Sequence, residues 1–127
     1  MRILIADDHE VVREGVRDVL EHSEGVQVVC EAVNGKEAIE AASELQPDLI
    51  IMDWSMPVLD GFAAARVIKG QSPQTAIVMF SVFADRQFIE LARKAGLNGL
   101  VAKEADGPAL LSAIDAVKHN QTYFPVL

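Results

Sequence analysis

The chain has 127 residues and half of them are hydrophobic, so it has the length and the apolar content of one compact domain. Its net charge of -8 and its pI near 4.7 argue against nucleic-acid binding by this segment, because nucleic-acid-binding domains usually carry a basic face. A single cysteine excludes an internal disulfide, and no apolar run is long enough to span a membrane, so we expect a cytoplasmic protein with no membrane contact.

Short apolar runs recur along the chain. The first, residues 2–6, begins directly after Met1, so we expect no signal peptide. Similar runs lie at residues 26–31, 48–53, 75–80 and 99–102. Short continuous apolar runs are typical of parallel strands that are buried on both faces.

The segments between these runs have helical spacing of apolar residues. The apolar positions are Val12, Val16, Val19 and Leu20; Ala38, Ala41, Ala42 and Leu45; Phe88, Leu91, Ala92 and Ala95; and Leu110, Leu111, Ile114 and Val117. We expect the third helix at 61–69 and the fourth at about 85–95, with Gln46-Pro47 ending the second and Asp106-Gly107-Pro108 capping the fifth. Alternating strands and helices predict an α/β fold: a single (βα)₅ doubly wound domain, residues 1–127, around a parallel five-stranded sheet.

Acidic residues follow two of the predicted strands. Asp7 and Asp8 come directly after the first strand, and Asp53 ends the third. Ligands of open α/β sheets bind beyond the carboxyl ends of the strands, so these carboxylates should share one pocket. Because clustered carboxylates repel one another, we expect a cation among them, and oxygen ligands favour Mg²⁺ over zinc.

Two further polar residues follow the fourth and fifth strands. Ser81 would cap the fourth helix or bind a phosphoryl oxygen, and Lys103 would be a solvated surface charge or bind a phosphoryl oxygen as a point charge. Taken alone, Ser81 is more simply a helix cap and Lys103 a solvated surface charge. The agreement of four strand ends favours a shared site.

Taken together with Met56-Pro57 and Asp60-Gly61, the residues Asp7-Asp8, Asp53, Ser81 and Lys103 resemble the receiver domain of two-component response regulators. The match spans nearly the whole chain. Segments 5–9 and 52–61 most resemble the NarL/FixJ subfamily, whose output is a LuxR-type helix-turn-helix domain. The resemblance implies a flavodoxin-like receiver fold in a phosphorelay protein that is not a conventional enzyme. We expect Met56-Pro57 to form a rigid turn and Asp60-Gly61 a flexible start to the third helix.

Carried over to this chain, the resemblance implies that Asp53 is the phosphoacceptor. The phosphoryl donor would be a phosphohistidine of a sensor histidine kinase or phosphotransfer protein. Asp8 and Asp53 would bind Mg²⁺ directly, Asp7 through water, and the backbone carbonyl of Ser55 would complete the protein ligands. Lys103 would add a second positive charge.

The resemblance also implies a conformational switch, in which the Ser81 hydroxyl moves toward the phosphoryl group. Many receivers have an aromatic residue three positions before the lysine, but this chain has Leu100 there. Lys103 is followed by Glu104, not proline, so a cis-proline is excluded at this joint. The signal would therefore pass through the Ser81 loop, which includes Phe83, or through dimer contacts.

The segment of about 120–127 is predicted to be an extended exit from the last helix. The resemblance implies a DNA-binding output domain that is missing from this chain, although a free-standing receiver stays an alternative. Phosphorylation would then promote a homodimer through the first and fifth helices, and DNA would be bound only through the missing domain.

His9, Trp54 and Phe83 lie next to predicted site residues in the sequence, and each has two possible roles. His9 adjoins the acidic pair, but a carboxylate site for Mg²⁺ does not need imidazole, so we expect His9 at the pocket rim and not as a ligand. Trp54 and Phe83 are ordinary packing residues or, in a sharper hypothesis, restrict the access of water to Asp53.

The alternatives to a phosphate-accepting receiver are a phosphatase, a nucleotide-binding domain and a protein-binding module. A haloacid dehalogenase-type phosphatase needs an acid two residues after its nucleophile, where this chain has Ser55. Nucleotide-binding motifs of the GxGxxG or GxxxxGK[ST] type are absent. A receiver that acts as a protein-binding module without phosphate stays an alternative.

Overall fold

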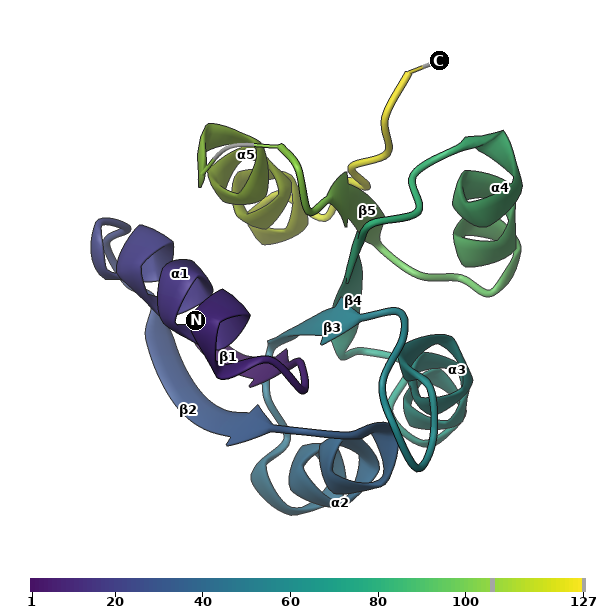
Figure 1. Cartoon of the computed structure of the whole chain (residues 1–127). Helices are drawn as coiled ribbons and strands as arrows, with labels where there is room; N and C mark the ends of the chain where they lie inside the picture. Colours follow the sequence, from purple (N-terminus) through teal and green to yellow (C-terminus); the bar gives the residue numbers. More distant parts are fainter. Residues whose placement is uncertain (106, 127) are drawn as a thin grey trace.

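A computed structural model describes residues 1–105 and 107–126. Strands and helices alternate throughout this part of the chain (Figure 1). The strands are β1 (Arg2–Ala6), β2 (Gln27–Ala32), β3 (Leu49–Asp53), β4 (Ala76–Ser81) and β5 (Gly99–Ala102). The helices are α1 (Glu10–Glu21), α2 (Gly35–Leu45), α3 (Gly61–Gln71), α4 (Arg86–Lys94) and α5 (Gly107–Lys118). The predicted (βα)₅ order is confirmed.

The strands form one parallel sheet in the order β2-β1-β3-β4-β5. The chain moves outward from β1 to β2, crosses back over β1 to β3, and then continues to β4 and β5. The strand order therefore reverses between β1 and β3. In open α/β sheets the crevice beyond the carboxyl ends at such a reversal is the usual ligand site.

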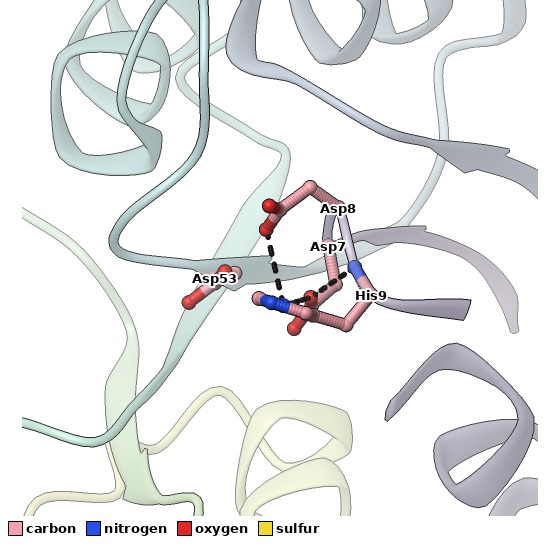
Figure 2. A group of neighbouring side chains, drawn as sticks. All are labelled: Asp7, Asp8, His9 and Asp53. Carbon is pink, nitrogen blue, oxygen red and sulfur yellow. Dashed lines mark hydrogen bonds and ion pairs between the residues drawn. The ribbon is translucent and has the colours of Figure 1, made fainter. Parts of the chain in front are cut away.

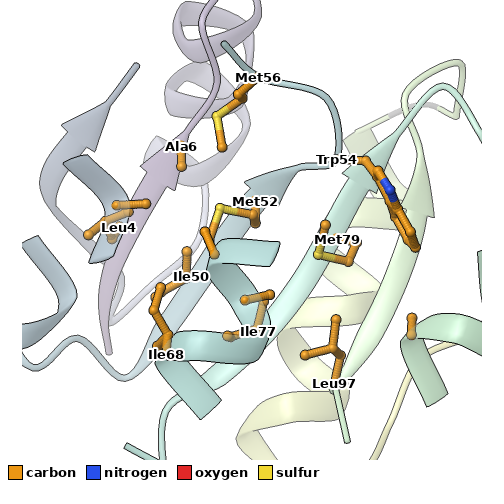
Figure 3. Close-up of a cluster of buried hydrophobic side chains, with 14 of the residues drawn as sticks. Leu4, Ala6, Ile50, Met52, Trp54, Met56, Ile68, Ile77, Met79 and Leu97 are labelled. Carbon is orange, nitrogen blue, oxygen red and sulfur yellow. The ribbon is translucent and has the colours of Figure 1, made fainter. Parts of the chain in front are cut away.

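Helices cover both faces of the sheet (Figure 1). α1 and α5 pack on one face, where Ile3 and Ile5 of β1 join a buried cluster with Val16 and Leu110. α2, α3 and α4 pack on the other face. There the alternate side chains of the same strands form a second cluster, which includes the Leu4, Met52 and Met79 side chains drawn in Figure 3. Burial on both faces explains why the strands are continuous apolar runs.

The structure corrects two details of the helix predictions. α4 begins at Arg86 with Asp85 as its N-cap, so Ser81 does not cap this helix. Its buried residues are Ile89 and Ala92, whereas the predicted face residue Leu91 is 39% exposed. The predicted cap residue Asp106 lies outside the described residues.

None of the helices in the described ranges is long and apolar enough to cross a membrane.

The chain returns to the edge of the sheet after α5. Tyr123 lies beside Gly99 in a parallel bridge, and the Leu100 backbone N–H donates to the Tyr123 carbonyl at 2.9 Å. The Arg93 guanidinium stacks over the Phe124 ring at 4.6 Å. The predicted exit segment is therefore attached to β5 and α4 over residues 123–124.

Gly61 fixes the start of α3 against the end of β3. A Cβ atom at this position would lie 1.7 Å from the Asp53 carbonyl oxygen, and the Gly61 N–H donates to the Trp54 carbonyl at 2.8 Å. The Asp60 side chain caps the helix by accepting from the Ala63 N–H at 2.7 Å. Glycine is required here for the close backbone approach, whereas the flexible start of α3 stays a prediction.

We predict that Gly61→Ala lowers the free energy of unfolding by at least about 2 kcal/mol, because the backbone of β3 or α3 must shift to admit the methyl group. Gly70→Ala in the same helix is the matched control. A Cβ there meets nothing within 4 Å, so helix propensity should raise stability by up to about 1 kcal/mol. Urea unfolding measures both variants. Equal effects of the two substitutions would contradict the close-approach role of Gly61.

Candidate functional site

Acidic side chains gather at the strand-order reversal. Figure 2 shows Asp7, Asp8 and His9 at the end of β1 and Asp53 across from them at the end of β3. One ligand atom from each of these residues lies within 4.8 Å of the others. The Asp7 and Asp53 side chains are only 2% and 6% exposed, whereas Asp8 is 29% exposed. The predicted convergence of the acids is confirmed.

Backbone contacts fix the end of β1. The Asp7 N–H donates to the Ala32 carbonyl at 3.0 Å, and the Asp7 carbonyl accepts from the Arg13 guanidinium at 2.7 Å. Arg13 also pairs with Glu31 of β2 at 2.9 Å. Sequence reasoning missed Arg13. Two facts could have pointed to Arg13 as a residue that supports the site. It lies one turn after His9, the N-cap of α1, and an acidic partner, Glu31, lies on the neighbouring strand.

Lys103 connects the acids from the opposite side of the site. Its Nζ atom lies 2.7 Å from Asp7 Oδ2 and 3.1 Å from Asp53 Oδ1. Its backbone N–H donates to the Ser81 carbonyl at 2.8 Å, so β4 and β5 together set its position. The interpretation as a solvated surface charge was wrong, because the Lys103 side chain is 15% exposed and pairs with two buried acids.

The protonation equilibria of the site are perturbed. Burial, and next the charge of Asp7, raise the pKa of Asp53, although the hydrogen bond and charge of Lys103 act to lower it. Burial acts to lower the pKa of Lys103, but its hydrogen bonds to Asp7 and Asp53 and their charges raise that pKa overall. Negative charge is therefore only partly balanced at the site.

The residues fit a hard divalent cation. Asp7 Oδ2 is buried and accepts no well-aligned hydrogen bond, although the Lys103 ammonium lies close to it. The surrounding carboxylates supply the oxygen ligands that Mg²⁺ prefers. An added cation would reduce the repulsion that raises the pKa of Asp53.

The two serines of the predicted site have different positions. The Ser55 N–H donates to Asp53 Oδ1 at 3.4 Å, and its side chain is exposed. Ser81 is fully buried at the end of β4, where its Oγ accepts from the Phe83 N–H at 2.9 Å. Ser81 thus reaches the site edge through β4, but its hydroxyl is held by its own loop.

An aromatic cluster borders the site on the α3–α4 side. The Trp54 ring stacks on Phe62 at 4.7 Å and meets Phe88 edge-on at 5.0 Å. Phe88 also stacks on Phe83 at 4.9 Å. Trp54 is therefore a core packing residue, whereas Phe83 is 45% exposed beside Ser81.

Comparison with known families gives one match over most of the chain. Residues 3–115 match the family model of the response regulator receiver domain. The transcriptional regulatory protein LnrK of Bacillus subtilis is 33% identical over 98% of this chain and 57% of its own length. The oxygen regulatory protein NreC of Staphylococcus epidermidis is 36% identical over 97% of this chain and 57% of its own length. The chain thus spans little more than half of these relatives.

Solved structures give the same result. A LuxR-family two-component response regulator from an Aurantimonas species superposes with a TM-score of 0.92 at 34% identity, covering 97% of this chain and 88% of that one. The isolated REC domain of RcsB from Salmonella enterica, with the phosphomimetic BeF₃⁻, has a TM-score of 0.91 at 28% identity. That comparison covers 98% of this chain and 93% of the other.

We predict that Asp53→Asn raises the free energy of unfolding at neutral pH. The pKa of Asp53 lies above its ordinary value of 3.8 in the folded state, so the folded protein binds more protons than the unfolded chain between these two values. Wild-type stability therefore falls as the pH rises through this window, and the advantage of the variant appears over the same window.

Urea unfolding as a function of pH, without divalent cations, measures this effect. Asp115→Asn is the matched control, because the Asp115 side chain is 73% exposed on α5. A stability gain of Asp53→Asn that persists unchanged below the ordinary pKa of an aspartate would contradict the electrostatic explanation.

Proposed function

Because the chain belongs to the response regulator receiver domain family, we propose that it accepts a phosphoryl group on Asp53 from the phosphohistidine of a sensor histidine kinase or phosphotransfer protein. The observation that carries this proposal is the Lys103 bridge between Asp7 and Asp53, which brings two buried carboxylates and one ammonium together at one edge of the sheet. The protein is not a conventional enzyme on this proposal. It catalyses only its own phosphorylation and dephosphorylation.

In the transfer step, an Asp53 carboxylate oxygen forms the new P–O bond while the P–N bond of the phosphohistidine breaks. The electron pair of the P–N bond stays on the kinase imidazole. Asp53 is held for this attack by Lys103 and by the Ser55 N–H, both of which contact Oδ1. An oriented carboxylate loses less freedom on reaching the transition state.

Four residues would hold Mg²⁺: Asp8 and Asp53 directly, Asp7 through water, and Ser55 through its backbone carbonyl. The bound ion would neutralise negative charge on the transferring phosphoryl group. The buried and poorly satisfied Asp7 carboxylate supports this assignment. Burial of the same carboxylates keeps water from screening their charges.

Lys103 and Ser81 would then respond to the phosphoryl group. The Lys103 ammonium can exchange its contact with Asp53 for a phosphoryl oxygen, because it already lies 3.1 Å from the acceptor carboxylate. The Ser81 hydroxyl would leave the Phe83 N–H, 2.9 Å away, and turn toward the phosphoryl group. Movement of the loop after β4 would follow.

We further infer that residues 1–127 form the receiver part of a transcription regulator that acts in the cytoplasm, with residues from about 120 leading to a DNA-binding output domain. The names of the relatives and the chain's coverage of 57% of their length support this inference. This domain would bind no nucleic acid itself. A free-standing receiver is the alternative.

Phosphorylation would promote a homodimer through α1 and α5. An apolar groove of about 310 Å³ lies between these helices and is lined by Val12, Val16, Val19 and Leu110. Val11 beside it is 80% exposed, which makes an apolar surface available to a second copy. Lys103 is one of the residues that line the groove, so its movement would alter this surface.

We predict that acetyl phosphate adds a single phosphoryl group to the wild type in the presence of Mg²⁺ and none to Asp53→Asn. Intact-mass spectrometry with and without Mg²⁺ tests the nucleophile and the metal together. A magnesium-independent adduct would refute the metal assignment. No adduct under any condition would favour the alternative of a phosphate-independent protein-binding module, and rapid release of phosphate from added esters would favour a phosphatase.

We predict opposite effects of Lys103→Gln on metal binding and on phosphoryl uptake. Loss of an ammonium that competes for Asp7 and Asp53 should tighten Mg²⁺ binding by about 1 kcal/mol, a factor of about five. The same loss removes a cation that stabilises the phosphoryl transition state, so phosphorylation should slow.

Calorimetric titration with Mg²⁺ and the rate of adduct formation measure these two effects. Lys69→Gln is the control, because the Lys69 ammonium binds the Thr75 carbonyl at 2.6 Å at the opposite edge of the sheet. Weaker Mg²⁺ binding in Lys103→Gln would show that Lys103 organises the acids and does not compete with the ion.

A further inference from the structure

The imidazole of His9 points into the acidic site, not away from it. Its Nδ1 atom lies 3.2 Å from Asp7 Oδ1 and 3.3 Å from Asp8 Oδ1, as Figure 2 shows. The backbone holds the ring there, because the His9 N–H donates to Asp7 Oδ1 at 2.9 Å and the His9 carbonyl accepts from the first turn of α1. The position therefore follows from the β1–α1 turn.

These distances match the spacing of ligands around a small divalent ion. Two ligand atoms about 2.1 Å from an octahedral ion and at a right angle are about 3 Å apart. His9 Nδ1 has about this separation from both neighbouring carboxylates, and one ring nitrogen of His9 lies within 4.8 Å of ligand atoms of Asp7, Asp8 and Asp53. Asp7 Oδ2 is a second and independent observation: it is buried, makes no geometrically aligned hydrogen bond and has the Lys103 ammonium, 2.7 Å away, as its ion-pair partner, so a further cation can share it.

We propose that His9 is an additional metal ligand, through Nδ1, and that it gives the receiver site a preference for imidazole-binding transition ions such as Ni²⁺ over Mg²⁺. Imidazole suits Ni²⁺ and its neighbours in the transition series, whereas Mg²⁺ takes oxygen ligands and keeps water in the same position. This inference rests on the metal site of the proposed function. It revises the expectation that His9 only lines the rim, because its 66% exposed ring still directs Nδ1 inward.

Isothermal titration with Ni²⁺ and with Mg²⁺ tests the inference on the purified protein. His9→Ala should weaken Ni²⁺ binding by about tenfold or more and leave Mg²⁺ binding within about twofold of wild type, because only Ni²⁺ gains from the imidazole. His9 makes no side-chain cap bond to α1, so the variant should fold. Unfolding of His9→Ala and His9→Asn verifies this.

Two controls remove the contribution of other histidines. His22→Ala tests an exposed histidine at the opposite end of α1, whose Nδ1 lies 2.7 Å from the Asp18 carbonyl oxygen. His119→Ala tests the exposed pair of His119 and Asp115, 3.7 Å apart on α5, which could bind Ni²⁺ by itself. Neither substitution should weaken the Ni²⁺ site that is lost in His9→Ala.

The outcomes separate the two proposals. Unchanged Ni²⁺ affinity in His9→Ala, with Mg²⁺ still bound, overturns the His9 ligand alone. Equal weakening of both ions also overturns it, because His9 would then only position Asp7 and Asp8. Absence of both Ni²⁺ and Mg²⁺ binding in the wild type refutes the metal site itself, and with it the proposed function's magnesium requirement.

Discussion

The burial of like charges at one sheet edge is the constraint on which the site depends. Asp7 and Asp53 are almost fully buried, and the Lys103 ammonium lies between them as their direct cationic partner. One ammonium cannot balance the acids, so the pKa of Asp53 stays raised by burial and by Asp7. A site with this imbalance attracts a divalent cation and gains from each added positive charge.

The fold separates this charge from the core. The interiors of β1 and β3 are apolar and buried in the two hydrophobic clusters, and charged side chains enter only where these strands end. Gly61 lets α3 start directly against the Asp53 backbone, and Arg13 holds the Asp7 carbonyl. The site is therefore strained electrostatically but supported by a rigid apolar scaffold, which places its side chains before a ligand arrives.

Leu100 stands where many receivers have an aromatic residue, so this chain has no ring at that position to turn. Its side chain is fully buried in the hydrophobic cluster on the α2–α4 face of the sheet. Aromatic contacts lie beside the loop after β4, where Phe83 stacks on Phe88 and Phe88 meets the edge of Trp54, the residue after Asp53. This ring series physically connects the Ser81 loop, α4 and the end of β3. A displacement of the Ser81 hydroxyl would meet these rings first.

Local residue patterns were enough to predict the alternation of strands and helices, the parallel sheet and the convergence of Asp7, Asp8, Asp53 and Lys103. Apolar runs and their polar ends are local patterns, and parallel strands must bring their carboxyl ends to the same edge. Tertiary structure alone decided the inward direction of the His9 ring, the close approach that requires Gly61, and the exposure of Leu91. The direction of the His9 ring depends on the exact geometry of the β1–α1 turn, and the other two features depend on how α3 and α4 pack against the sheet. A pattern of residue types specifies neither.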